Sequence, residues 1–237
     1  TRALEALVKE TFPSSEIVRA PLSADLPLSR TEQAALTNPL RQCGRLGCIG
    51  NVGYTGFVDT SDLRGIGTIL ELAELMPDVC FHIVGGGSEE AVAFWKSAAE
   101  RKSVTLNTHF YGRQNPGRVP AFLNHLGVVL SPLKLRPTKS APFGKNASPL
   151  KIPQYLAYGK AIVASDIPAH REYLVHEKNA LLVGETDYDA WCRSIRFLLE
   201  NPDTRLKMAE ANELLYLTSF THQKRVEVIL DGEFYGD

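Results

Sequence analysis

The sequence has no apolar run that approaches the roughly 18 residues of a membrane-spanning helix, so we predict none within these 237 residues. Its four cysteines are Cys43, Cys48, Cys80 and Cys192. They form no CxxC pair and have no histidine at metal-ligand spacing, which predicts free, structural thiols in a reducing compartment and no metal site. The sequence also lacks a GxGxxG after its first strand, a GxxxxGK(S/T) motif, a nucleophile elbow and a Ser-His-Asp order. These absences exclude the best-known dinucleotide, P-loop and hydrolase signatures.

Acidic residues are absent from residues 101–165, which we call the basic segment, although the whole chain has a formal net charge of −1. The segment contains these cations: Arg101, Lys102, Arg113, Arg118, Lys134, Arg136, Lys139, Lys145, Lys151 and Lys160. We expect a positive surface that attracts anionic ligands, the alternative being a solvated face balanced by the acidic helices on either side. The chain has no interleaved aromatic and basic residues and no nucleic-acid-binding motif. A phosphate-bearing small molecule is therefore a better expected ligand than nucleic acid.

The hydrophobic content of 44% and charged content of 22% are typical of a soluble globular protein. Apolar strands are predicted at 48–57, 79–87, 104–112, 127–132, 160–166 and 179–184. Helices are predicted at 62–76, 88–102, 117–126, 148–159, 169–176, 187–200, 203–218 and 220–231. This alternation predicts an α/β fold with a doubly wound parallel sheet covered by helices on both faces. Residues 1–40 stand outside the alternation, so we expect the domain to begin near residue 41.

Ligands of open parallel sheets bind at the carboxyl ends of the strands, where several glycine-rich loops are expected here. In "SPLKIPQYLAYG", Ser148 and Pro149 suit the N-cap and first turn of a helix. Lys151 would lie in that first turn, where a cation opposes the helix dipole and a nearby anion would explain it. A tolerated surface lysine is the alternative. Arg64 repeats the pattern after the first glycine turn, so we predict two helix N-termini that clamp a diphosphate.

Residues 41 to about 218 resemble the carboxy-terminal, donor-binding half of a GT-B glycosyltransferase of family 4. The resemblance rests on "GYTGFVDTSDLRGIGTILEL", "FHIVGGG", "THFYGR", "VPAFLNHLGVVLSP", "SPLKIPQYLAYGKAIVASDIPAHREYL" and "NALLVGETDYDAWCRSIRFLLENPDTRLKMAEA", which stand in the family's order. It implies a doubly wound Rossmann-like parallel sheet, the C-terminal half of a GT-B fold. Residues 1–40 would then be a remnant of the amino-terminal domain and linker, and 41–237 the nucleotide-sugar-binding domain.

The resemblance also implies roles for particular residues. Arg64 and Lys151 would offset charge on the departing nucleoside diphosphate, an electrostatic catalytic role. The turn at Gly56 and Phe57 would bind substrate, although Phe57 stands where the family usually has a basic residue. No metal and no cofactor besides the donor substrate are expected.

Other positions would bind the rest of the donor. Gly112 and Arg113 would lie beside the base, and Ser148, Pro149 and Leu150 would offer backbone N–H groups.

Asn146 and Gln154 are expected at the donor site too, where the family usually carries two glutamates. Gln154 would accept one hydrogen bond from the ribose without bringing a charge.

The implied function is retaining transfer of a sugar from a nucleotide diphosphate sugar, an activity of the hexosyltransferase type in polysaccharide, lipid or glycan biosynthesis. The acceptor, a sugar or a lipid-linked group, would be bound mostly by a missing amino-terminal domain, so the chain alone would be incomplete. A cytoplasmic location is expected, with peripheral contact of the full-length protein at the inner face of a membrane and no nucleic-acid partner. Two alternatives stay open: a non-catalytic nucleotide-binding module of the same fold, and a nucleotide-sugar isomerase.

Overall fold

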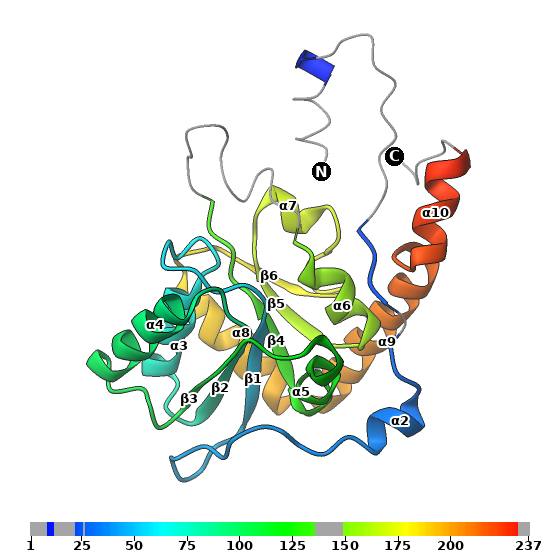
Figure 1. Cartoon of the computed structure of the whole chain (residues 1–237). Helices are drawn as coiled ribbons and strands as arrows, with labels where there is room; N and C mark the ends of the chain where they lie inside the picture. The colour runs from blue at the N-terminus through cyan, green and yellow to red at the C-terminus, as the bar shows by residue number, and fades with distance from the viewer. Residues whose placement is uncertain (1–8, 12–21, 26, 136–148, 232–237) are drawn as a thin grey trace.

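Six parallel strands form one sheet in the order β3-β2-β1-β4-β5-β6 (Figure 1). The computed structural model describes residues 9–11, 22–25, 27–135 and 149–231. The strands are β1 (Gly50–Thr55), β2 (Val79–Val84), β3 (Thr108–Gly112), β4 (Val128–Ser131), β5 (Ala161–Ser165) and β6 (Leu181–Val183). Every neighbouring pair is parallel. All six predicted strands are confirmed, each shorter than its apolar run because the ends of the runs form the connecting turns.

Helices cover both faces of the sheet, as the alternation predicts. They are α2 (Arg30–Ala34), α3 (Ile66–Leu75), α4 (Glu89–Arg101), α5 (Val119–His125), α6 (Lys151–Ala157), α7 (Pro168–Arg171), α8 (Tyr188–Glu200), α9 (Pro202–Ser219) and α10 (His222–Asp231), with a 3-10 turn η1 (Pro116–Arg118) before α5. Side chains of α3, α4 and α8 share one core with the sheet, and those of α5, α6 and the end of α9 share another. The prediction of a doubly wound fold is therefore confirmed.

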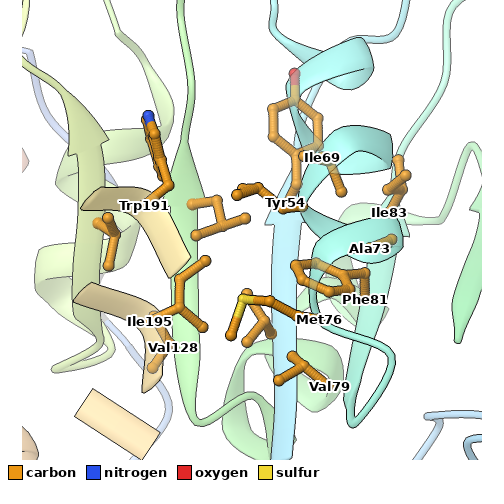
Figure 2. Close-up of a cluster of buried hydrophobic side chains, with 14 of the residues drawn as sticks. Tyr54, Ile69, Ala73, Met76, Val79, Phe81, Ile83, Val128, Trp191 and Ile195 are labelled. Atoms are coloured by element: carbon orange, nitrogen blue, oxygen red, sulfur yellow. The ribbon is translucent and has the colours of Figure 1, made fainter. Parts of the chain in front are cut away.

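The first core lies between the sheet and α3, α4 and α8. Figure 2 shows Trp191 and Ile195 of α8 beside Val128 of β4, with Met76 and Phe81 in the same cluster. All five side chains are almost completely buried. Burying each large apolar side chain contributes about 1.5–3 kcal/mol. The helical spacing puts the apolar residues of α8 on one face, and their burial holds α8 on the sheet.

The second core anchors α6 beneath the carboxyl end of the sheet. Ile152 and Tyr155 are fully buried in it. The Tyr155 hydroxyl accepts a hydrogen bond from the Thr55 backbone N–H at 2.9 Å and donates to the Leu130 carbonyl at 3.3 Å. This one side chain therefore ties α6 to the ends of both β1 and β4, the two central strands.

The described residues before β1 run along the outside of the domain. The Tyr216 hydroxyl of α9 donates to the Ala24 carbonyl at 3.0 Å, and Arg30 pairs with Glu213 at 2.9 Å. These contacts place the segment against α9. The domain boundary near residue 41 stays a prediction.

Three cations of the basic segment do not add to the positive surface that its composition predicts. Among the described residues, Lys102 pairs with Glu71 at 2.9 Å and Lys134 pairs with Asp62. Lys160 is half-buried, and burial lowers its pKa to about 8. The prediction is wrong for these cations because folding brings acidic residues from outside the segment against two of them and removes the third from water.

Candidate functional site

A cleft of about 410 Å³ opens at the carboxyl ends of the central strands. The strand order reverses between β1 and β4, the switch point at which open α/β sheets bind their ligands. The cleft is lined by Tyr54, Thr55, Gly56, Phe57, Arg64, Val84, Gly85, Gly86, Arg113, Gln114, Val119, Leu133, Pro149, Leu150, Lys151 and Gln154. Loops after β1, β2 and β3 thus face the beginning of α6 across the cleft, a geometry suited to a small ligand.

Gly85 lets the loops after β1 and β2 approach each other at the floor of the cleft. Its φ is +132°, and a Cβ built there would lie 1.9 Å from the Gly56 carbonyl oxygen. Only glycine fits such a contact without moving the backbone. A glycine is therefore required at position 85 by the packing of the two loops, whether or not a ligand approaches it.

Lys151 is the first residue of α6, and its Nζ atom is enclosed although the residue as a whole is half-buried. Nζ lies 3.7 Å from the centre of the Tyr54 ring and has no hydrogen-bond partner among the described residues. Burial lowers the pKa of Lys151 well below its ordinary value, and repulsion from Arg64 lowers it further. A desolvated cation–π contact stabilises a charge by about 2 kcal/mol, whereas enclosing an ammonium costs several kcal/mol. The ring alone does not compensate for the lost water.

Arg64 faces the cleft from the turn that precedes α3. Its Nε lies 3.8 Å from an Asp59 carboxylate oxygen, and its guanidinium lies 6.0 Å from the centre of the Phe57 ring. The Phe57 side chain is 54% exposed, so the pair forms an open wall of the cleft. A planar guanidinium in this position can grip a phosphate through two parallel hydrogen bonds.

The predicted clamp of two helix N-termini is wrong at α3. The helix begins at Ile66, after Arg64 and the N-cap Gly65, so Arg64 is not in the first helical turn. The carboxylate of Asp62 accepts the Gly67 backbone N–H at 2.7 Å. An anion from the chain itself therefore already occupies the beginning of α3, and Arg64 does not oppose a bare helix dipole.

The predicted beginning of α6 is also wrong. The helix starts at Lys151, with Leu150 rather than Ser148 in the N-cap position and no side-chain cap. Pro149 precedes it outside the helix and has no N–H to donate. Leu150 is 71% exposed at the rim. The predicted helix from 148 to 159 is thus shortened to seven residues: Pro149 and Leu150 line the cleft before it, and it ends at Ala157, with Tyr158 as its C-cap.

The structure brings most of the predicted site residues together. Those that line the cleft are Gly56, Phe57, Arg64, Arg113, Pro149, Leu150, Lys151 and Gln154. Gly112 ends β3 beside the cleft without lining it. Asn146 and Ser148 lie outside the described residues.

Sequence reasoning assigned no individual role to several lining residues: Tyr54, Thr55, Val84, Gly85, Gly86, Gln114, Val119 and Leu133. Gln114 directly follows Arg113 in the predicted loop and could have been included with it. Tyr54 gave no local signal, because its contact with Lys151 joins two elements that are far apart in the sequence.

His170 follows the loop after β5 but does not line the cleft. Its side chain is completely buried, Nδ1 donates to the Ser165 carbonyl at 2.7 Å, and the Ser131 hydroxyl donates to Nε2 at 2.8 Å. Burial lowers the pKa of His170 to about 4. A neutral His170 thus joins the ends of β4 and β5 behind the cleft.

Within residues 9–11, 22–25, 27–135 and 149–231, no three His, Cys, Asp or Glu side chains form a group that could hold a metal ion. Among the helices of this same part of the chain, none combines the length and apolar character that crossing a bilayer requires.

Comparison with known proteins adds an independent finding. The model of the family described as "Glycosyl transferases group 1" matches residues 60–215, which contain most of the cleft residues. The curated proteins that were searched include none that matches the chain.

Solved structures are similar in fold. A mutant of TarM from S. aureus, in complex with fondaparinux, α-GlcNAc-glycerol and UDP, superimposes with a TM-score of 0.71 at 17% identity over 98% of this chain. HepE from Anabaena, in complex with UDP and glucose, gives 0.66 at 16% identity over 89% of this chain. The chain covers 42% of TarM and 54% of HepE. It covers 100% of the C-terminal domain of the glycosyl transferase group 1 family protein LpcC from Francisella tularensis, with a TM-score of 0.63 at 16% identity over 85% of this chain.

Proposed function

The chain belongs to the glycosyl transferases group 1 family, and on that premise we propose that it is the nucleotide-sugar-binding domain of a glycosyltransferase. Its fold is a doubly wound Rossmann-like sheet, the C-terminal half of a GT-B fold, in agreement with the match to the whole C-terminal domain of LpcC. Since the chain spans only about half of the longer relatives, the activity of a complete enzyme is part of the proposal.

The observation that carries the proposal is the pair of basic side chains in the cleft at the switch point. Both Arg64 and Lys151 line it, one from the loop after β1 and one from α6. Breaking the bond between a sugar and a diphosphate leaves negative charge on the departing diphosphate. Fixed cations in an enclosed site stabilise that charge more strongly than water does. Arg64 and Lys151 would supply this stabilisation, so that no metal ion is required.

The remaining donor contacts are those that the family resemblance implies, and the lining of the cleft supports two of them. Arg113 would lie beside the base, and Gln154 beside the ribose, since both border the same cleft as the two cations. Transfer would retain the configuration of a hexosyl group and deliver it to a sugar or lipid-linked acceptor held mostly by another domain. A role in polysaccharide, lipid or glycan biosynthesis, a cytoplasmic location and membrane-face contact of the full-length protein remain predictions.

One observation favours a second candidate function. Gln154 lines the cleft at the position where the family resemblance implies a ribose-binding glutamate. An amide cannot accept hydrogen bonds as strongly as a carboxylate. The same fold could therefore bind a nucleotide without transferring a sugar.

Calorimetric titration of UDP, GDP and ADP into the purified chain tests the proposal. UDP is the first probe because the TarM and HepE structures contain it. We expect one diphosphate to bind, with the matching nucleoside binding much more weakly. If none of the three diphosphates binds, the chain is not a nucleotide-sugar-binding domain. Binding without sugar transfer by the full-length protein would favour the second candidate.

A further inference from the structure

The amine of Lys151 sits in a closed environment that contains no matching negative charge among the described residues. Its accessible area is below 1 Å², and it rests against the ring face of Tyr54. The sequence of residues 136–148 contains no aspartate or glutamate, so these residues cannot provide a carboxylate either. Tyr54 contacts this amine through its ring, and Arg64 and His170 interact with it electrostatically. Asp59 and Tyr155 are the titratable groups next to Tyr54.

None of these groups neutralises a charged Lys151. The Asp59 carboxylate lies within ion-pair distance of Arg64, which repels an ammonium at Lys151. Buried Tyr54 keeps its proton because burial raises its pKa, and its hydroxyl donates to the Phe57 carbonyl at 2.7 Å. The local environment therefore disfavours the charged form of Lys151 as long as the cleft holds no anion.

A diphosphate changes this balance, because it brings two or three negative charges to the side of the cleft that Lys151 borders. We propose that Lys151 is a neutral amine in the ligand-free protein and takes up one proton from solvent when a nucleoside diphosphate or nucleotide diphosphate sugar binds. The N–H bond forms on Nζ, and the proton comes from water or buffer acid. This inference rests on the proposed function, because it requires a diphosphate in the cleft.

Proton uptake would make binding selective for the diphosphate. A ligand without phosphate brings no charge to stabilise the ammonium, so it would leave Lys151 neutral. Affinity for the diphosphate would rise as the pH falls toward the pKa of Lys151 in the free protein, because the proton is then bound at less cost. Below that pKa, Lys151 is already protonated in the free protein, so it would no longer make the affinity depend on pH.

Calorimetry in two buffers of different ionisation enthalpy measures the uptake directly. The titration of UDP is performed at about pH 8.5, where the terminal phosphate, with a second pKa near 6, is already ionised. We expect an uptake that approaches about one proton per UDP bound. The Lys151→Arg variant is the matched control: arginine stays protonated at this pH, so it should bind UDP without uptake. Uridine should bind, if at all, without uptake.

A second measurement does not depend on ligand. In the free protein, the titration of Lys151 is followed by NMR of the ¹³Cε signals in protein with ¹³C-labelled lysine, and the Lys151 signal is assigned by its loss in Lys151→Arg and Lys151→Met. We expect this signal to titrate far below those of the surface lysines. The inference is overturned if Lys151 titrates together with the surface lysines. It is also overturned if wild type and Lys151→Arg take up the same number of protons when they bind UDP. If Lys151 titrates low but no nucleoside diphosphate binds, the proposed function fails and the proposal of ligand-driven uptake fails with it.

Discussion

Nζ of Lys151 lies 3.7 Å from the centre of the Tyr54 ring, so the first residue of α6 packs directly against the end of β1. The amine has exchanged water for an aromatic face without gaining a hydrogen bond from a described residue. This arrangement costs stability, and it keeps the amine at the wall of the cleft. The two consequences can be separated by mutation.

Replacing Lys151 by methionine should stabilise the free protein at neutral pH by about 1 kcal/mol or more, because a buried ionisable group is replaced by an apolar one. The pKa of Lys151 in the folded protein lies below its ordinary value near 10.5, so the unfolded chain binds more protons between the two values. Wild-type stability therefore rises with pH in this window, and the advantage of Lys151→Met shrinks toward pH 10. Urea unfolding at several pH values measures the difference in the free energy of unfolding between the variant and wild type. If this difference does not change with pH, Lys151 is not a buried neutral amine.

Replacing Arg64 by alanine should weaken nucleoside diphosphate binding by about 1.5–3 kcal/mol, the scale of a lost charge-assisted hydrogen bond. Affinity for the nucleoside should stay nearly the same, because the guanidinium would contact only phosphate. Calorimetric titration measures both, with Arg101→Ala as the control, since Arg101 ends α4 and does not line the cleft. Wild-type affinity for the diphosphate in Arg64→Ala would remove Arg64 from the site.

The Gln154→Glu variant should bind a nucleoside diphosphate as well as wild type or more tightly, by up to about 1 kcal/mol. A carboxylate accepts from two ribose hydroxyls more strongly than an amide does. Repulsion from the diphosphate opposes the gain and has to be screened by Arg64 and Lys151. The readout is the affinity for UDP relative to its 2′,3′-dideoxy analogue. No change for either ligand would show that Gln154 does not contact the ribose.

His170→Gln should make the protein more resistant to acid. Burial lowers the pKa of His170 to about 4 in the folded protein, against about 6.5 when unfolded. The unfolded chain thus binds more protons in this range, and stability falls as the pH drops from 6.5 to 4. At pH 5 this residue should have lowered the free energy of unfolding of the wild type by about 2 kcal/mol. Glutamine can donate to Ser165 and accept from Ser131, but it does not titrate. Acid unfolding of the two proteins is followed by circular dichroism. If both unfold at the same pH, His170 is not the buried neutral group that lowers stability in acid.

The purified chain should not transfer sugar to an acceptor, even where it binds a donor. The cleft lies at the sheet edge, and in the proposed function another domain would hold the acceptor. Transfer needs a held acceptor and exclusion of water. An assay with a nucleotide sugar and a panel of sugar and lipid-linked acceptors measures turnover. Transfer above the rate of donor hydrolysis would mean that the acceptor site lies within these residues.

The fold and the place of the cleft were predictable because they depend on local pattern. Alternating apolar strands and amphipathic helices predict a doubly wound sheet, and such a sheet binds ligands at its switch point. The same reasoning, with the family resemblance, identified Arg64, Lys151 and Gln154, and all three line the cleft. The ends of α3 and α6 were predicted wrongly: α3 begins only after Gly65, with the Asp62 carboxylate accepting the Gly67 N–H, and Pro149 and Leu150 line the cleft instead of beginning α6.

From the sequence alone, Lys151 was expected in the first turn of a helix at the cleft, because it follows "SPL" directly. Whether this lysine is a solvated cation or an enclosed amine was decided only by the tertiary structure. Its state depends on Tyr54 and Arg64, which reach it from β1 and from the turn before α3. Periodicity and spacing describe neighbours along the chain, whereas desolvation and charge repulsion depend on every group within a few ångströms in space.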